Sequence, residues 1–157
     1  MKQIFVLCFC FLFMIIVATG CNKSKFLKTE YVEGIVRLDG EIVPEGTEVM
    51  FSPVVEGKGM PAIGRTDKSG LYTLSSTDGV PGKGAVEGDY KITVKYYEVT
   101  EYEEGDPRAP RDSYGNAQLS TSKLVTPPVY SQIMRTPLTY TVVKGKQTHD
   151  LDLVSKP

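Results

Sequence analysis

The chain has 157 residues, and its 18 basic and 19 acidic side chains leave a net charge of −1. Proteins that capture nucleic acid through its phosphates carry an excess or a patch of positive charge, so we expect no nucleic-acid partner. The chain contains a single histidine, which excludes a zinc site built from a cluster of histidines.

The first 21 residues have the layout of a secretory signal. Lys2 precedes an apolar run over residues 4–17, and small residues then lead to Cys21. The apolar run is shorter than the roughly 17–25 residues that a membrane-spanning helix requires. We therefore predict a signal peptide over residues 1–20 that is removed on export.

Residues 18–21, A-T-G-C, resemble the lipobox of bacterial lipoproteins. The resemblance implies cleavage before Cys21 and a diacylglyceryl group on its sulfur, whereas an ordinary signal cut after Gly20 would leave no lipid. The membrane is then a partner through acylated Cys21, and residues 21–30 form a polar, lipidated tether. Asn22 stands where some two-membrane bacteria carry an aspartate that retains lipoproteins at the inner membrane. We expect a cell-envelope protein, at the outer membrane where the cell has one.

The mature chain is expected to be one domain without disulfides. Cys8 and Cys10 lie within the predicted signal peptide, so Cys21 is the only cysteine that remains after cleavage. An exported domain without a cysteine pair cannot be a disulfide scaffold. We predict that the domain spans residues 31–155 and is stabilised by burial of its core.

From residue 31 onward, short strands alternate with turns. Glycine and proline recur at short intervals, and no window shows sustained helical periodicity. Asp39-Gly40 is a hairpin turn signal, and Asp67–Gly70 has the chemistry of a tight hairpin with glycine in the left-handed region. We predict an all-β fold, an antiparallel β-sandwich of about seven strands. The expected strands are 31–38, 49–51, 62–66, 71–74, 90–96, 138–143 and 150–154.

Two strand predictions are more specific. Segments 138–143 and 150–154 are expected to pair with each other across residues 144–146. In segment 90–96, the period of two predicts one buried face and one solvated face. The buried face carries Tyr90, Ile92, Val94 and Tyr96, and the solvated face carries Lys91, Thr93 and Lys95.

Three spaced motifs resemble the carboxypeptidase regulatory-like, or transthyretin-like, domain. They occur in that family's order over residues 34–40 (GIVRLDG), 64–74 (GRTDKSGLYTL) and 88–94 (GDYKITV). The resemblance covers about residues 31–154 and implies a transthyretin-like sandwich in a small bacterial lipoprotein. Because this fold hosts many unrelated roles, the resemblance implies no particular ligand.

No constellation of residues for catalysis, cofactor binding or metal binding stands out. His149 lacks the nucleophile-elbow context of a Ser-His-Asp site, and we expect it to be a surface residue. The carboxylates of 98–106 lack the spacing of a calcium loop, and we expect a solvated, mobile loop there. Lys91 and Asn116 are available for an intramolecular isopeptide bond, but no motif supports one.

The long insertion near 98–128 is the first candidate for partner binding, because loops beyond about 12–15 residues are usually functional or disordered. Tyr97, Tyr102 and Tyr114 are the candidate contact residues, since tyrosine rings stack on sugars and peptides; rings that fill a core and a disordered spacer are the alternatives. We expect a membrane-anchored, non-catalytic module that holds an envelope protein or a polysaccharide. The alternative is an envelope enzyme whose site is built from loops.

Overall fold

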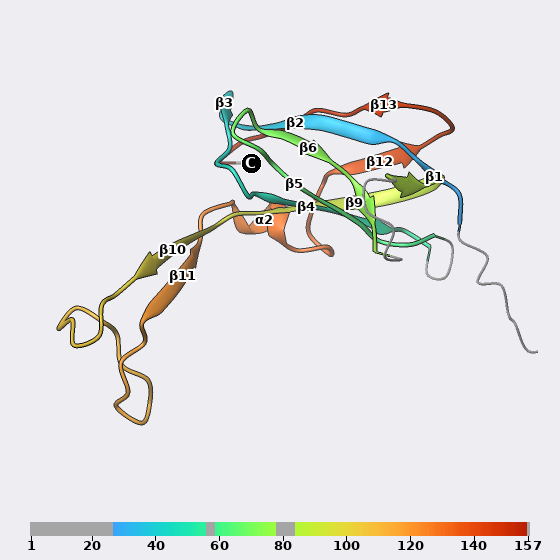
Figure 1. Ribbon diagram of the computed structural model, residues 1–157. Coiled ribbons are helices and arrows are strands. Elements are labelled where there is room, and N and C mark those ends of the chain that lie inside the picture. Colours follow the sequence, from blue (N-terminus) through green and yellow to red (C-terminus); the bar gives the residue numbers. More distant parts are fainter. Residues whose placement is uncertain (1–26, 56–58, 78–83, 157) are drawn as a thin grey trace, which may run out of the picture.

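A computed structural model describes residues 27–55, 59–77 and 84–156 (Figure 1). The predicted signal peptide and Cys21 lie outside these residues. Within the described residues the regular secondary structure is almost entirely β-strand, and the helix is α2 (Pro128–Ser131). No helix in this part of the chain is long and apolar enough to cross a membrane.

The first sheet is antiparallel throughout. Its strand order is β12-β9-β4-β5-β7, so β9 and β4 lie in the middle and β12 and β7 at the edges. The strands are β4 (Glu48–Pro53), β5 (Ala62–Arg65), β7 (Ser75–Ser76), β9 (Gly88–Lys95) and β12 (Thr139–Val142).

The second sheet is built around β2 (Val32–Leu38). On one side β2 pairs antiparallel with β6 (Leu71–Thr73) and β3 (Glu41–Ile42). On the other side it pairs parallel with β13 (Gln147–Thr148) and β14 (Leu151–Leu153). The prediction of antiparallel pairing therefore fails for the C-terminal strands, which run in the same direction as β2.

The two sheets pack face to face and enclose one apolar core, as expected for a β-sandwich (Figure 1). Phe51 lies at its centre, with its ring centroid 5.9 Å from that of Tyr90 and 6.3 Å from that of Tyr72. Side chains that are almost fully buried come from both sheets, and they include Val32, Val36, Val49, Tyr72, Leu74, Ile92, Val94, Val142, Leu151 and Leu153.

The alternation predicted for segment 90–96 is confirmed for most of β9, but Tyr96 lies just beyond the strand and is only partly buried. Tyr90, Ile92 and Val94 are buried, whereas Lys91 and Lys95 remain partly exposed. Thr93 is the exception, because it lies on the outer face and is nevertheless buried. Helix α2 packs against β9, so the outer face of the sheet is partly covered at this point.

The Asp67–Gly70 turn has the predicted chemistry but not the predicted role. The Asp67 carboxylate accepts hydrogen bonds from the backbone N–H groups of Ser69 and Leu71, and Gly70 has φ +74°. However, β5 pairs with β4 and β7, whereas β6 pairs with β2. The turn therefore carries the chain from one sheet to the other and does not close a hairpin.

The expected pairing between the last two segments is also wrong. Strand β12 pairs with β9 in the first sheet, whereas β14 pairs with β2 in the second. The connection at Lys144–Lys146 again crosses between the sheets. By contrast, the turn at Asp39-Gly40 is a true hairpin turn, since β3 folds back on β2 and both turn residues have positive φ.

The two ends of the sandwich differ. At the end where the described chain begins, β1 (Thr29–Glu30) pairs with β8 (Ala85–Val86). Strand β9 runs from that end to the opposite one, where β10 (Tyr97–Glu101) and β11 (Ser120–Leu124) form an antiparallel hairpin. This hairpin projects away from the sandwich (Figure 1). We call residues 97–124 the arm; the loop predicted near 98–128 contains this ordered ribbon.

Candidate functional site

The base of the arm is attached firmly to the sandwich. The N–H of Tyr96 donates to the hydroxyl of buried Thr126 (2.8 Å), and the N–H of Val125 donates to the carbonyl of Tyr96 (2.9 Å). Thr126 lies just before α2, which packs on β9. The arm therefore leaves the sandwich at a fixed point and is not an extension on a free linker.

The register of the ribbon decides which side chains share a face. Residues directly opposite one another point to the same side, so Tyr97 and Val99 lie on one face together with Leu124, the partner of Tyr97. Tyr97 is 49% exposed and Val99 57% exposed. This face of the ribbon thus presents apolar side chains to solvent near the base of the arm.

The structure places all three predicted contact tyrosines on the arm but does not bring them together. Tyr97 and Tyr102 are five positions apart along β10 and its continuation, so they point to opposite faces. The N–H of Tyr102 donates to the carbonyl of Leu119 (2.9 Å), which extends the ribbon beyond β10. Tyr114 lies in a turn at the far end and is 89% exposed.

The turn that carries Tyr114 repeats the geometry of the Asp67–Gly70 turn. The Asp112 carboxylate accepts the N–H groups of Tyr114 and Asn116, both at 2.9 Å, and the N–H of Gly115 donates to the carbonyl of Asp112. These bonds correspond one for one to those made by Asp67. They lower the pKa of Asp112, mainly through its hydrogen bonds with Asn116. The exposed Tyr114 is thus held on a well-defined turn.

The expectation of a solvated, mobile acidic loop is only partly right. Asp106 is bound by Arg108 through a 2.8 Å ion pair, and this hydrogen-bonded pair lowers the pKa of the carboxyl. The glutamates of the arm are exposed and have no ion-pair partner within the described residues. No group of three or more His, Cys, Asp or Glu side chains in this part of the chain is placed to hold a metal ion.

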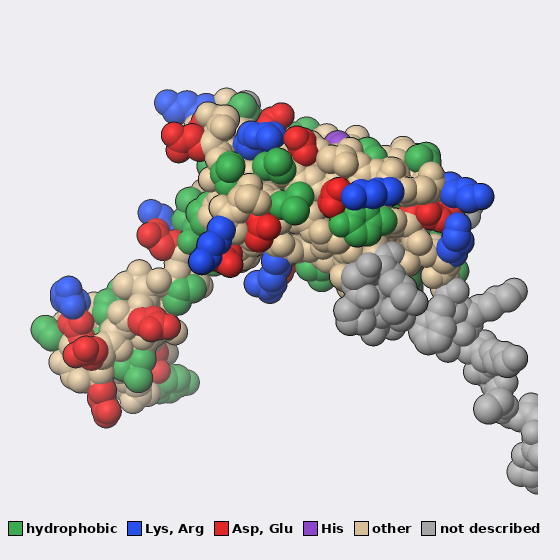
Figure 2. Space-filling model, turned by 45° about the horizontal axis from the view of Figure 1, so that its top comes forward, with side chains coloured by type: hydrophobic (Ala, Val, Ile, Leu, Met, Phe, Trp, Pro, Cys, Tyr) green, Lys and Arg blue, Asp and Glu red, His purple; other side chains and the backbone are tan. Residues whose placement is uncertain are grey.

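The arm is distinctly acidic. Its six carboxylates and three basic side chains give residues 97–124 a net charge of −3, although the whole chain is almost neutral. Figure 2 shows the arm as a separate lobe with several acidic side chains on its surface. The acidic residues are Glu98, Glu101, Glu103, Glu104, Asp106 and Asp112.

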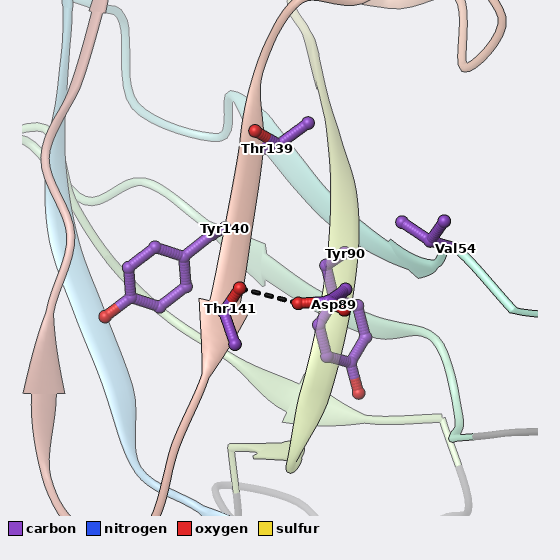
Figure 3. Close-up of a pocket in the computed structure, with 6 residues that line it drawn as sticks. All are labelled: Val54, Asp89, Tyr90, Thr139, Tyr140 and Thr141. Carbon is purple, nitrogen blue, oxygen red and sulfur yellow. Dashed lines mark hydrogen bonds between the residues drawn. The ribbon is translucent and has the colours of Figure 1, made fainter.

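A second candidate is an open depression of about 500 Å³ beside β9 and β12 (Figure 3). The Thr141 hydroxyl donates to the Asp89 carboxylate at 2.6 Å, and the Tyr90 hydroxyl donates to the carbonyl of Val86 at 2.8 Å. The hydroxyls of Thr141 and Tyr90 are therefore already bonded within the depression or to the backbone, and the Tyr140 hydroxyl donates to the side chain of Gln147. Within the described residues no further side chain bonds to the Asp89 carboxylate, so the pair of Thr141 and Asp89 lacks the third group that orients the base of an activated nucleophile. Its lining residues are Val54, Asp89, Tyr90, Thr139, Tyr140 and Thr141.

His149 is not the simple surface residue that we expected. Its imidazole stacks on the ring of Tyr140, with centroids 4.0 Å apart, and meets Phe51 edge-on. Burial lowers the pKa of His149, and the neighbouring Asp150 opposes this effect. Within the described residues the ring makes no hydrogen bond to a serine or a carboxylate. The geometry of a Ser-His-Asp site is therefore absent there.

The isopeptide pair considered from the sequence is not assembled. The ammonium of Lys91 donates to the carbonyl of Ile133, whereas the side chain of Asn116 donates to Asp112 within the arm. Sequence reasoning also missed Val99 and Leu124, which complete the apolar face beside Tyr97. Two short signals were present: apolar and polar residues alternate over residues 97–100, and the Asp-x-x-Gly pattern of Asp67 recurs at Asp112.

Comparison with known proteins identifies no relative, since no protein-family model, no curated protein and no solved structure matches this chain. The candidate site therefore rests on its geometry alone. Of the surfaces described, the arm combines projection from the sandwich, exposed apolar side chains and unpaired charge.

Proposed function

We propose that this protein is a membrane-anchored, non-catalytic lipoprotein of the cell envelope whose arm contacts a partner protein. Acylated Cys21 supplies the anchor, and the sandwich is the rigid body that carries the arm. The observation that carries the proposal is the projecting ribbon itself. An isolated two-stranded hairpin is only marginally stable in water, and here such a hairpin exposes apolar side chains from an ordered base.

The positions of the anchor and the arm support this function. The described chain starts beside β1 and β8, and the arm leaves from the opposite end of β9 (Figure 1). The eight residues of β9 span about 26 Å at about 3.3 Å per residue. A lipid on Cys21 would therefore hold one end of the sandwich at the membrane and direct the arm away from that surface.

A protein partner fits the arm better than a polysaccharide does. Aromatic platforms for sugars need rings that lie on one face, whereas Tyr97 and Tyr102 point to opposite faces of the ribbon. The apolar face of Tyr97, Val99 and Leu124 instead resembles the aromatic and aliphatic anchors of protein interfaces. An enzymatic function has no comparable support, because the described residues present no nucleophile with a base and a group that orients it.

The anchor is tested by the distribution of the Cys21→Ser variant between membrane and soluble fractions. We expect the wild type in the membrane fraction of the envelope and the variant in the soluble exported fraction, with the same thermal melting temperature. The melting temperature is unchanged because Cys21 lies before the first described strand. A variant that remains in the membrane fraction contradicts the lipid anchor.

The contact role of the arm is tested by site-specific photo-crosslinking in intact cells. A benzophenone amino acid replaces Tyr97 or Tyr114 on the arm, and Val143 serves as the control because it is 54% exposed on the sandwich. We expect protein adducts from the two arm positions and none from position 143. Adducts from position 143 alone, or no adduct from either arm position, contradict the proposal.

A further inference from the structure

We propose that the partner protein adds an extended strand to the free edge of β10, and that the residues of this strand alternate between apolar and basic. This inference rests on the proposed contact role of the arm and specifies the chemistry of that contact. Strand addition to an exposed sheet edge is an established mode of peptide recognition, in which backbone bonds supply affinity and alternate side chains supply specificity.

Both edges of the arm are open. Within the described residues β10 and β11 pair only with each other. At one end of the ribbon the N–H of Val125 donates to the carbonyl of Tyr96, and at the other the N–H of Tyr102 donates to the carbonyl of Leu119. The backbone groups of the even-numbered residues of β10 therefore point toward β11. Hydrogen-bonded and non-hydrogen-bonded pairs alternate in an antiparallel ladder. The backbone N–H and C=O groups of Tyr97, Val99 and Glu101 therefore point outward, toward an empty edge.

Charge distinguishes the two edges. Strand β10 carries Glu98 and Glu101, which are exposed and form no ion pair, and the next residues along the chain include Glu103 and Glu104. Strand β11 carries one charge, that of Lys123. Opposite charges on neighbouring strands are favourable and like charges directly opposite are unfavourable. A basic strand therefore fits the β10 edge and is disfavoured at the β11 edge.

The two faces of the ribbon determine which residues of the added strand are apolar and which are basic. An added strand places successive side chains on opposite faces. On one face they meet Tyr97 and Val99, whose apolar surface is exposed, and then Glu101 at the end of the strand. On the other face they meet Glu98. Apolar residues suit the positions beside Tyr97 and Val99, and lysine or arginine suits the positions beside Glu98 and Glu101.

A second copy of this chain is a poor occupant of the same edge. If the arms of successive copies stacked in parallel into one sheet, each arm would take up two strand spacings, or about 10 Å. The sandwich attached to each arm is wider, because its five-stranded first sheet is roughly 20 Å across at about 4.8 Å per strand. Neighbouring sandwiches would overlap. Antiparallel pairing of β10 with the β10 of a second copy would instead bring Glu98 and Glu101 of both chains onto adjacent strands. Their like charges would repel each other. An extended segment from another protein avoids both problems.

The test uses the full mature chain with Cys21→Ser and two synthetic nine-residue peptides, one alternating valine with lysine and the other valine with glutamate. Fluorescence anisotropy at low ionic strength measures their affinities. We expect the lysine peptide to bind at least tenfold more tightly than the glutamate peptide. Added salt should reduce this preference, because exposed charges are screened.

Two proline variants locate the edge. Val99→Pro removes an outward N–H of β10 without breaking a bond to β11, and Ser122→Pro makes the matched change on the free edge of β11. We expect Val99→Pro to weaken binding of the lysine peptide at least tenfold and Ser122→Pro to leave it within twofold. The double change Glu98→Gln and Glu101→Gln should abolish the preference for lysine while the backbone edge stays intact.

Equal effects of the two proline variants, or equal binding of the two peptides, overturn the inference. Self-association of the protein that is lost in Val99→Pro also overturns it, because the occupant would then be a second copy. The contact role is judged separately by the crosslinks from positions 97 and 114. If those crosslinks form while the peptide results fail, strand addition is wrong and the contact role of the arm stands.

Discussion

The main-chain carbonyl of His149 occupies the space that a β-carbon on Gly34 would need. This carbonyl cannot easily move, because it accepts the Tyr72 hydroxyl at 2.7 Å, while the N–H of His149 donates to the main-chain carbonyl of Glu33 at 2.8 Å. Gly34 thus allows the C-terminal strand to lie against β2 at the point where β13 ends and β14 has not yet begun.

The first prediction follows from this close approach. Gly34→Ala should lower the free energy of unfolding by about 3 kcal/mol or more, at or above the upper end of the usual range for overpacking. Gly46→Ala is the control, because the added carbon there meets nothing within 4 Å and only the positive φ opposes it, at a cost of roughly 1–2 kcal/mol. Urea denaturation of both variants compares the two effects. Similar losses would mean that the C-terminal strand moves away from Gly34 without penalty.

The second prediction concerns the two faces of β9. Ile92 is fully buried, so Ile92→Ala should cost about 2–5 kcal/mol as a large-to-small change in the core. Lys91 points to the opposite face, and Lys91→Ala should stay within about 0.5 kcal/mol of the wild type. Both values come from the same denaturation experiment. Equal costs would contradict the facing of the strand.

The third prediction concerns the turn that crosses between the sheets. At Gly70, a β-carbon would lie 2.6 Å from a methyl group of Ile42 and 3.1 Å from the carbonyl of Val36, at φ +74°. Gly70→Val should therefore destabilise the fold more than Gly40→Val, which has a positive φ but open space around it. Thermal melts of the two variants provide the comparison. A smaller loss at Gly70 would show that crowding there is relieved by movement of β3.

The fourth prediction is a dependence of stability on pH. Burial lowers the pKa of His149 below its unfolded value of about 6.5. Between the two pKa values the unfolded chain binds more protons than the folded chain, so stability rises with pH in this window and falls as the pH drops below about 6.5. His149→Phe keeps the ring against Tyr140 and removes the titration. The difference in unfolding free energy between pH 7.5 and 5.5 should be larger in the wild type than in His149→Phe, and equal differences would refute the assignment.

Local chemistry was readable from the sequence, whereas strand partners were not. The Asp67 carboxylate, the positive φ of Gly70 and the inward positions of Ile92 and Val94 each depend on a few neighbouring residues. The same turn chemistry serves a hairpin and a crossing between sheets. Which one forms depends on where Tyr72 and Leu74 find apolar surface, and this is a property of the whole core.

The arm illustrates the same limit at the candidate site. Tyr97, Tyr102 and Tyr114 could be selected by residue type, but their relation depends on the register of β10 with β11. Most of the ribbon is polar and exposed, so it lacks the alternation of buried and solvated residues that identifies a strand in a sandwich. Proline and glutamate in the same region favoured a loop. The Asp-x-x-Gly pattern at Asp112 indicates a local turn, but a local turn does not reveal that the ribbon leading to it is ordered.

The start of the described chain and the arm lie at opposite ends of the sandwich, and this has a mechanical consequence for the proposed anchor. A pull between a lipid anchor and a partner on the arm would draw β2 toward the membrane and β9 away from it, each along its own axis. Ladder hydrogen bonds run across the strands, so such a pull loads the bonds of β2 with β6, β13 and β14 together in shear instead of opening them one at a time. In this direction the sandwich resists force as a unit, and its lifetime under load is set by its rate of forced unfolding.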